Sequence, residues 1–430
     1  MNEPRSADPP AITINDRVLH QIIDGFGVST AFRRNELIRA LPEDKRREVL
    51  DLWFSRERGA GLSILRLGIG SAPLGSPYDE MVSIQPEDPG GPDAPPAYVW
   101  DGDDNSQVWM AKAAQEYGVR RFFAVAWSAP GYMKDTGEDR NGGRLKPEWQ
   151  QAYADYLVQY TRFYAQEGIQ ITELGFANEP DWTAPHASMR FSPEEAARFV
   201  KVLGPIASGV RLVCCESVGW TEARAYTSAI EADAGARRWV KVHTGHSYAT
   251  PVDSPLPTER PTWMSEWHPN GTCWNENWYD GSGSDGFTIA LAVHDALTLG
   301  GVSGYLYWLG ASTGKTRALL LIDEEAKTYR VSKRLWALAA YSRFVRPGAV
   351  RLDVAVAKPA LKVSAFRNPD GSRVVEVLNT GMAPVTWEGV DGHVSAYLTD
   401  EDESLGSLPV EGGAVTLPPR ALTTIVLGQT

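Results

Sequence analysis

The chain has 430 residues, 43% of them hydrophobic and 10% aromatic, which is enough for one large domain and a smaller second one. Its formal net charge is −12 and it has no run of lysine and arginine, so nucleic acid and anionic membranes are unfavourable partners. No stretch reaches the ~18 apolar residues that a membrane span needs. Residues 1–6 lack the apolar core of an export signal. We therefore expect a monomer that is secreted after removal of a signal, or cytoplasmic if this N-terminus is the natural one.

Short apolar strands alternate with helical patterns from residue 22 to residue 344. A loop rich in proline, glycine and aspartate interrupts them at 71–103, and a loop of that length is usually functional or disordered. Eight strands with such crossovers predict an α/β fold, a (β/α)8 TIM barrel over residues 16–346. The predicted strands are 21–26, 62–69, 119–126, 171–177, 210–215, 240–248, 261–266 and 302–308. The predicted helices are 36–59, 104–117, 148–166, 192–203, 221–231, 286–299 and 333–344.

After residue 348 the pattern changes to an alternation with a period of two, with Pro-Asp-Gly and Glu-Gly-Gly turns and no helical segment. Such a pattern predicts a C-terminal antiparallel β-sandwich, a side domain over residues 347–430. A further strand at residues 11–15 precedes the barrel and has no parallel partner in it. We therefore expect this N-terminal strand to join the sandwich.

The cysteines and histidines give no sign of a metal site. Cys214 and Cys215 are neighbours, and because a disulfide between neighbours would strain the backbone, we expect two buried thiols. Cys273 stands alone, and the seven histidines lack the spacing of metal ligands. No phosphate-binding loop or nucleotide motif is present either. The sequence therefore predicts a protein that needs no metal and no organic cofactor.

Polar and aromatic residues gather at the ends of the predicted barrel strands. Asn178-Glu179-Pro180 follows a short buried strand, and Glu266-Trp267 ends another one 87 positions later (266 − 179). The carboxyl ends of barrel strands form one rim, where active sites lie, so we expect these side chains to meet. The other strand ends at this rim are Gly25-Phe26, Arg66, Trp127, Tyr248 and Trp308.

Two carboxylates between aromatic walls suit the hydrolysis of a glycosidic bond. One carboxyl group must be protonated to donate to the leaving oxygen, and the other must be ionised to attack the anomeric carbon. Arg66 and Tyr248 can hydrogen-bond one of them and hold it ionised. Purely structural interpretations stand beside this one: Glu179 as a satisfied carboxylate, Arg66 as a buried ion pair, and Trp308 as a cap on the barrel core.

Several segments carry a family resemblance. They are Asp24-Gly-Phe-Gly-Val-Ser-Thr-Ala-Phe-Arg-Arg34, Cys214-Cys-Glu-Ser-Val-Gly-Trp220, Trp274-Asn-Glu-Asn-Trp278-Tyr279 and Gly304-Tyr-Leu-Tyr-Trp308. Together with Asn178-Glu179 on the fourth strand and Glu266 on the seventh, they resemble glycoside hydrolase family 30, in the clan of retaining (β/α)8 glycosidases. Within that family, the chain is most similar to the subfamily 7 branch of xylanases and glucuronoxylanases, known mainly from fungi. The resemblance covers almost the whole chain.

The resemblance implies a role for each strand-end residue. Glu179 would be the acid/base and Glu266 the nucleophile, on xylan or glucuronoxylan as the polysaccharide partner. A loop after the eighth strand reads the uronate branch in bacterial glucuronoxylanases of the family, but the corresponding segment here, 310–317, lacks their Tyr/Arg-rich pattern. The other implied roles are a contact of Asn178 with the sugar 2-hydroxyl, positioning of Glu266 by Arg66 and Tyr248, walls formed by Trp127 and Trp308, and a grip of Arg34 on the glucuronate branch.

Two other interpretations stay open. The same family acts on β-1,6-galactan and β-1,6-glucan, and the loop 71–103 can shape one side of the cleft for such a linkage. A protein of another class, a catalytically silent barrel that only binds carbohydrate, is the second. The presence of both Glu179 and Glu266 argues against it.

Overall fold

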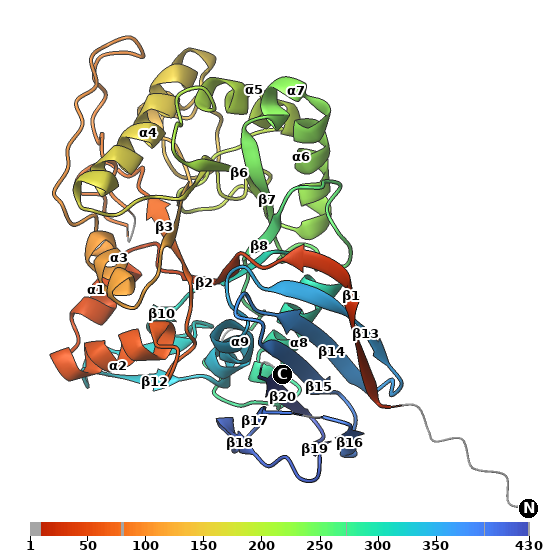
Figure 1. The fold of residues 1–430 in the computed structure, drawn as a ribbon. Coiled ribbons are helices and arrows are strands. Elements are labelled where there is room, and N and C mark those ends of the chain that lie inside the picture. The colour runs from red at the N-terminus through yellow and green to blue at the C-terminus, as the bar shows by residue number, and fades with distance from the viewer. Residues whose placement is uncertain (1–9, 79–80, 272, 391, 429–430) are drawn as a thin grey trace, which may run out of the picture.

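The computed structural model describes residues 10–78, 81–271, 273–390 and 392–428, so residues 1–6, on which the expected localisation depends, lie outside the described part. Within it, eight parallel strands close into a barrel and a β-sandwich lies beside the barrel (Figure 1). This confirms the predicted (β/α)8 barrel with its C-terminal sandwich. The barrel strands are β2 (Gly25–Ser29), β3 (Ile64–Ile69), β4 (Arg121–Ala126), β5 (Glu173–Gly175), β6 (Arg211–Ser217), β7 (Val240–His246), β8 (Thr262–Glu266) and β9 (Gly304–Tyr307).

Helices cover the outside of the barrel (Figure 1). The start of α5 follows its sequence signal: the hydroxyl of Ser192 accepts from the backbone N–H of Glu195, whose carboxylate accepts from the backbone N–H of Ser192. Among the described residues, no helix combines the length and the apolar character that a membrane crossing requires. The α-helices are α1 (Arg34–Arg39), α2 (Glu43–Phe54), α3 (Gln107–Glu116), α4 (Gln150–Gln166), α5 (Pro193–Leu203), α6 (Trp220–Ala232), α7 (Ala234–Arg237), α8 (Gly286–Thr298) and α9 (Lys333–Phe344), and the 3-10 helices are η1 (Gly131–Met133) and η2 (Pro147–Trp149).

Three sequence predictions of local structure are wrong. The helical pattern over 36–59 is divided into two helices, α1 and α2, and Pro42, which the sequence marks as a helix start, is the N-cap of α2. The strand 21–26 is divided at Asp24, whose carboxylate pairs with Arg121 at the start of β4. The expected pair of thiols is a disulfide between neighbours, Cys214 and Cys215, whose Cα atoms lie 3.0 Å apart.

The barrel interior has apolar layers between two charged ends, with Glu173 paired to Arg121 and Arg211 at the strand starts and Arg66 near the strand ends. Trp263 fills the lower part, where its indole N–H donates to Asp24 Oδ2 at 2.9 Å. Gly304 leaves room for that ring, since a Cβ at position 304 would lie 2.8 Å from it. Arg66, two residues after Ile64 on β3, is completely buried and brings a positive charge to the upper layer. Its charge needs buried carboxylate partners, and the site described below supplies them.

The side domain joins the two ends of the chain. β1 (Ile12–Ile22) pairs antiparallel with β13, so the N-terminal strand extends the sandwich sheet and runs seven residues beyond residue 15 (22 − 15). The large sheet has the order β1-β13-β14-β15-β20-β17-β18, and β16 pairs with β19. Besides β1, the strands of the side domain are β13 (Val350–Val356), β14 (Leu361–Arg367), β15 (Arg373–Asn379), β16 (Val385–Glu388), β17 (Val394–Thr399), β18 (Ser404–Leu408), β19 (Ala414–Leu417) and β20 (Ala421–Leu427). A small sheet that the sequence did not predict follows β9: β10 (Ala311–Ser312), β11 (Leu320–Asp323) and β12 (Thr328–Val331).

Helices α8 and α9 pack against the sandwich (Figure 1). Lys362 on β14 forms an ion pair with Asp295 of α8 at 2.8 Å. On β15, Glu376 is completely buried and accepts a hydrogen bond from the hydroxyl of Thr424 at 2.8 Å. Burial raises the pKa of Glu376 well above its usual range, which favours the protonated form.

Candidate active site

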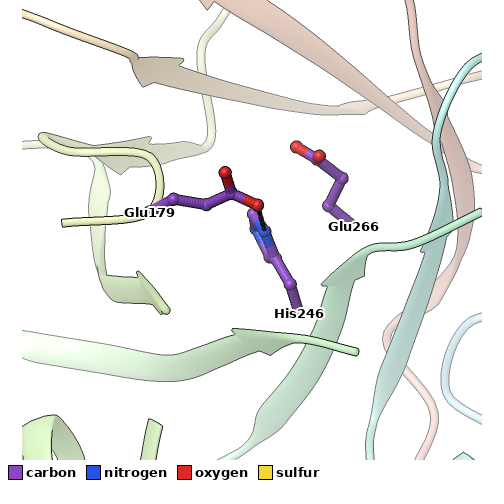
Figure 2. Close-up of side chains that lie close together, drawn as sticks. All are labelled: Glu179, His246 and Glu266. Atoms are coloured by element: carbon purple, nitrogen blue, oxygen red, sulfur yellow. Dashed lines mark hydrogen bonds and ion pairs between the residues drawn. The ribbon is translucent and has the colours of Figure 1, made fainter. Parts of the chain in front are cut away.

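Two carboxylates meet at the C-terminal rim of the barrel, as the sequence predicts. Glu266 ends β8, and Glu179 lies four residues past the end of β5, where its backbone N–H donates to the carbonyl of Glu216 at 2.8 Å. One carboxylate oxygen of each lies within 4.8 Å of the other and of a ring nitrogen of His246. Figure 2 shows the two carboxylates facing each other across a gap, with His246 at the side of Glu179. The rim position is the one at which barrel enzymes carry out their chemistry.

Glu266 is held by a cation and a phenol. Nη1 of Arg66 donates to its Oε2 at 2.5 Å, and the hydroxyl of Tyr248 donates to its Oε1 at 3.0 Å. Burial lowers the pKa of Arg66, but the carboxylates of Glu216 and Glu266 outweigh this and raise it. Burial, followed by the charge of Glu266, raises the pKa of Tyr248 well above its usual range, so the phenol keeps its proton and donates. Both oxygens of Glu266 therefore have charge-stabilising donors.

Glu179 is held by a histidine that the sequence interpretation missed. Nδ1 of His246 lies 3.0 Å from Oε1 of Glu179, and Nε2 lies 3.3 Å from Oε2 of Glu216. His246 is completely buried, which lowers its pKa, but Glu266, Glu179 and Glu216 outweigh burial and raise the pKa to about 10. With an acceptor at each ring nitrogen and this raised pKa, the protonated form of His246 is favoured, in which both ring nitrogens donate. A signal was available, because Glu216 directly follows the predicted strand 210–215 and His246 lies two residues before the end of the predicted strand 240–248.

Asn178 is fixed by the same arginine that holds the nucleophile candidate. Nη2 of Arg66 donates to Oδ1 of Asn178 at 2.6 Å, and the backbone N–H of Asn178 donates to the carbonyl of Ala126 at 2.8 Å. Because Oδ1 is engaged as an acceptor, the side-chain NH2 group is the donor that Asn178 can offer to a ligand.

The carboxylates open into a cavity of about 420 Å³ with aromatic walls. The rings of Trp127 and Trp308 lie 5.6 Å apart, and Phe32 packs edge-on against both, at 5.2 and 5.9 Å. Apolar walls with a few converging polar groups are the usual form of a small-molecule site. The residues that line the cavity are Trp127, Asn178, Glu179, Trp182, His186, Val218, Tyr248, Ala249, Glu266, His268 and Trp308.

Two site candidates, Arg66 and Arg34, do not line this cavity. Arg66 is buried against Glu266 and Asn178. Arg34 begins α1 and is not among the described residues that line the cavity, so its proposed role stays a prediction. A different cation approaches instead: Nη2 of Arg317 lies 3.3 Å from Nε2 of His268, which does line it. Arg317 also donates to the carbonyl of Gly271. Burial, and then the charge of Arg317, lower the pKa of His268 to about 4, so His268 is neutral.

Trp182 also escaped the sequence interpretation, although it lies only two residues after Pro180. Its side chain lines the cavity and is 52% exposed, so it stands at the mouth, where a sugar ring can stack on it. His186 lines the same cavity, and burial lowers its pKa, which favours the neutral form.

The rim set of Glu179, His246 and Glu266 offers carboxylate oxygens and an imidazole nitrogen, which are common metal ligands. Each of these three side chains already has a protein partner, however, and Arg66 occupies one oxygen of Glu266 with a positive charge. Oxygen and nitrogen ligands of zinc lie about 2.0–2.2 Å from the ion, so a set spread over as much as 4.8 Å would have to contract and displace those partners. The donor set fits proton transfer better than metal binding.

Comparison with known families agrees with this geometry. Residues 9–238 match the model of O-glycosyl hydrolase family 30, and residues 348–425 match the model of the glycosyl hydrolase family 30 beta sandwich domain. The chain belongs to glycoside hydrolase family 30. As a member of this family it is a glycoside hydrolase, and the rim carboxylates lie where its barrel predicts them.

The individual proteins that this chain resembles carry different names. The structure of the catalytic domain of GH30 xylanase C from Talaromyces cellulolyticus is 35% identical, with a TM-score of 0.91 over 97% of this chain and 100% of that chain. Glucuronoxylanase XynC of Bacillus subtilis (strain 168) is 27% identical over 76% of this chain and 79% of its own. A putative glucosylceramidase 2 of Caenorhabditis elegans is 25% identical over 85% and 76% of the two chains. An endo-1,6-beta-D-glucanase of Neurospora crassa is 23% identical over 84% and 79%. Family membership therefore leaves the sugar linkage open.

Proposed function

We propose that the protein hydrolyses the β-1,4-xylosidic backbone of xylan with retention of configuration. Glu266 attacks the anomeric carbon while Glu179 gives its proton to the glycosidic oxygen, so the bond from the anomeric carbon to the leaving oxygen breaks as an ester to Glu266 forms. Glu179, now ionised, then takes a proton from a water molecule, which attacks the anomeric carbon and releases Glu266. The observation that carries the proposal is the pair of rim carboxylates, each held by a different cation.

The spacing of the two groups supports retention. Carboxyl groups of retaining enzymes lie about 5–5.5 Å apart, whereas inverting enzymes leave about 6.5–9.5 Å for a water molecule between them. Oxygens of Glu179 and Glu266 within 4.8 Å of each other match the shorter class. The assignment of roles follows the free oxygens. Both oxygens of Glu266 accept from described donors, Arg66 and Tyr248, which suits an ionised nucleophile, whereas Oε2 of Glu179 has no described donor and can carry the proton toward the leaving oxygen.

Xylan is favoured as the substrate by similarity over the whole fold. The xylanase structure covers nearly the entire chain at 35% identity, a higher value than those of the three curated relatives named above. The walls formed by Trp127 and Trp308 suit the flat apolar faces of a pyranose ring, and Trp182 extends this surface to the cavity mouth.

We further propose that an acidic glucuronate branch on xylan is recognised by an arginine at the edge of the site. A protein with a net charge of −12 repels an acidic polymer, so a local cation is needed to hold the branch. Arg34, from the family resemblance, is the first candidate, and Arg317, beside His268, is the second. Arg34→Ala and Arg317→Ala, each compared on glucuronoxylan and on unbranched xylooligosaccharides, separate them. The arginine that reads the branch loses kcat/KM only on glucuronoxylan, and equal losses on both substrates exclude it.

A hydrolysis panel tests the substrate. Release of reducing ends is measured on xylan, β-1,6-galactan and β-1,6-glucan, with the product anomer followed by NMR from the first turnover. We expect xylan to be cleaved with the β-anomer formed first. The second candidate function is hydrolysis of β-1,6-glucan, which the similarity to the Neurospora glucanase favours, and cleavage of β-1,6-glucan instead of xylan would support it. Binding without cleavage of any of the three would contradict both and leave a carbohydrate-binding protein.

A further inference from the structure

A third carboxylate, Glu216, lies beneath the two that face the cavity. It directly follows the Cys214–Cys215 pair on β6, is completely buried and does not line the cavity. Its Oε2 accepts from Nη2 of Arg66 and lies 3.3 Å from Nε2 of His246. A single carboxylate oxygen therefore contacts both cations of the site.

Each of those two cations binds one of the two catalytic carboxylates. Arg66 binds Glu266 through its other terminal nitrogen, and His246 binds Glu179 through its other ring nitrogen. Glu216 is thus the common partner of two arms, which are the contact series Glu216–Arg66–Glu266 and Glu216–His246–Glu179, and each arm ends on one reacting carboxylate. A shift of Glu216 would move both arms, because each cation bridges rigidly between two anions.

The backbone of Glu216 is tied to the site as well. Its carbonyl accepts from the N–H of Glu179 at 2.8 Å, and its own N–H donates to the hydroxyl of Thr244 at 3.0 Å. Glu216 has φ 57° and Glu179 has φ 46°, both in the left-handed region that side chains other than glycine seldom adopt. Such conformations persist where the surroundings over-determine them, and they cluster at functional sites.

The charges of the site explain what a third anion does. With Glu179 protonated, Arg66 and His246 are balanced by Glu216 and Glu266. In the proposed reaction Glu266 becomes a neutral ester and Glu179 becomes the anion, so one negative charge moves from one arm to the other. Glu216 stays ionised throughout: burial raises its pKa, but Arg66 and His246 outweigh burial and lower it to about 2. It is the fixed counterion of both cations in both half-reactions.

We propose that Glu216 is a positioning residue that keeps Arg66 and His246 in place while the negative charge moves between Glu266 and Glu179. This inference rests on the proposed function. Without Glu216, the two cations would compete for the remaining anion and relocate as the charge moves. The expected cost lies in the chemical steps, since Glu216 touches no part of the cavity that binds the substrate.

The test is Glu216→Gln, which keeps the size of the side chain and removes its charge. Glu173→Gln is the matched control, because Glu173 is also buried and also pairs with two cations, Arg121 at 3.3 Å and Arg211 at 3.0 Å. Glu173 lies at the start of the barrel strands, at the opposite end from the catalytic rim. The assay measures kcat and KM on p-nitrophenyl β-xylobioside, per active site titrated with a 2-fluoro xylobioside inactivator. Thermal unfolding reports the stability of each variant.

We expect Glu216→Gln to lower kcat about 10- to 100-fold with KM changed less than about twofold, the size of effect that a small misplacement of reacting groups produces. Glu173→Gln should keep the wild-type kcat per active site, whatever its stability. A wild-type kcat in Glu216→Gln, or equal losses in both variants, would overturn the inference. If Glu216→Gln does not fold, Glu216→Asp serves, because it keeps the charge but is too short to reach both cations. It should lose kcat to a smaller extent, and a wild-type kcat would again refute the role.

Glu179→Ala and Glu266→Ala, measured beside these variants, keep the two proposals apart. If both alanine variants retain wild-type activity, the proposed function fails. If Glu266→Ala is inactive while Glu216→Gln is unaffected, only the inference about Glu216 fails.

Discussion

Replacement of Glu179 by glutamine isolates the proton that the proposed acid donates. The contact with His246 uses Oε1 of Glu179, and a glutamine carbonyl can accept the same hydrogen bond at 3.0 Å. The variant therefore keeps its position and loses only the proton transfer. General acid catalysis contributes about 10²- to 10⁴-fold, so kcat on xylan should fall by that factor, or about 2.7–5.4 kcal/mol of transition-state stabilisation.

The leaving group decides the result on a synthetic substrate. A 2,4-dinitrophenolate departs without a proton, so formation of the glycosyl-enzyme from 2,4-dinitrophenyl β-xylobioside should keep nearly its wild-type rate in Glu179→Gln. A burst of dinitrophenolate followed by slow turnover is expected, and added azide should speed that turnover because it attacks without a general base. Glu266→Gln is the matched control and should be inactive on both substrates. Equal losses on xylan and on the activated substrate in Glu179→Gln would refute the division of roles.

Three further predictions concern the nucleophile, the side domain and metal dependence. Tyr248→Phe removes one of the two described side-chain hydrogen bonds to Glu266. A hydrogen bond to a charged group contributes about 1.5–3 kcal/mol, so kcat/KM on xylooligosaccharides should fall roughly ten- to hundred-fold. An unchanged kcat/KM would contradict the role of the phenol. Glu376 has a pKa raised by burial, so the unfolded chain loses that proton first as the pH rises, and stability declines from about pH 4.5 upward. Glu376→Gln should therefore raise the melting temperature more at pH 8 than at pH 4, in thermal scans at both values; the same shift at both would argue against a titrating Glu376. Dialysis against EDTA should leave kcat unchanged, and loss of activity that Zn²⁺ or Ca²⁺ restores would show that the rim set binds a metal.

The fold was readable from the sequence because its signals are local. Buried parallel strands need short apolar runs, and eight such runs precede residue 310 in the right alternation with helices. The boundaries were less secure where one residue decided them. Pro42 is the N-cap of α2 after α1 has ended at Arg39, and the gap between β1 and β2 contains Asp24, which pairs with Arg121, a partner 97 residues away (121 − 24).

The candidate site was readable to the extent that barrel topology makes strand ends neighbours. That rule placed Glu179, Glu266 and Tyr248 around one cavity before any coordinates were known, because the carboxyl ends of all barrel strands reach one rim. The rule says nothing about a residue in a loop, such as Trp182 or Arg317, since a loop's path depends on packing against other loops. Arg34 follows the first barrel strand and begins α1 outside the cavity lining, so its role in recognising the branch stays a prediction.

The sequence by itself determined the barrel, the sandwich and the two carboxylates, because strand and helix periodicity and chain order are properties of neighbouring residues. The family resemblance already paired Arg66 and Tyr248 with Glu266, but only the tertiary structure showed that His246 and Glu216 belong to the same network. Arg66 lies 150 positions before Glu216 and 200 before Glu266, and no local pattern links them. Burial of a guanidinium without partners is too costly, so the folded barrel has to supply several acceptors to one cation. The network of Arg66, His246 and Glu216 beneath the cavity is the result of that requirement.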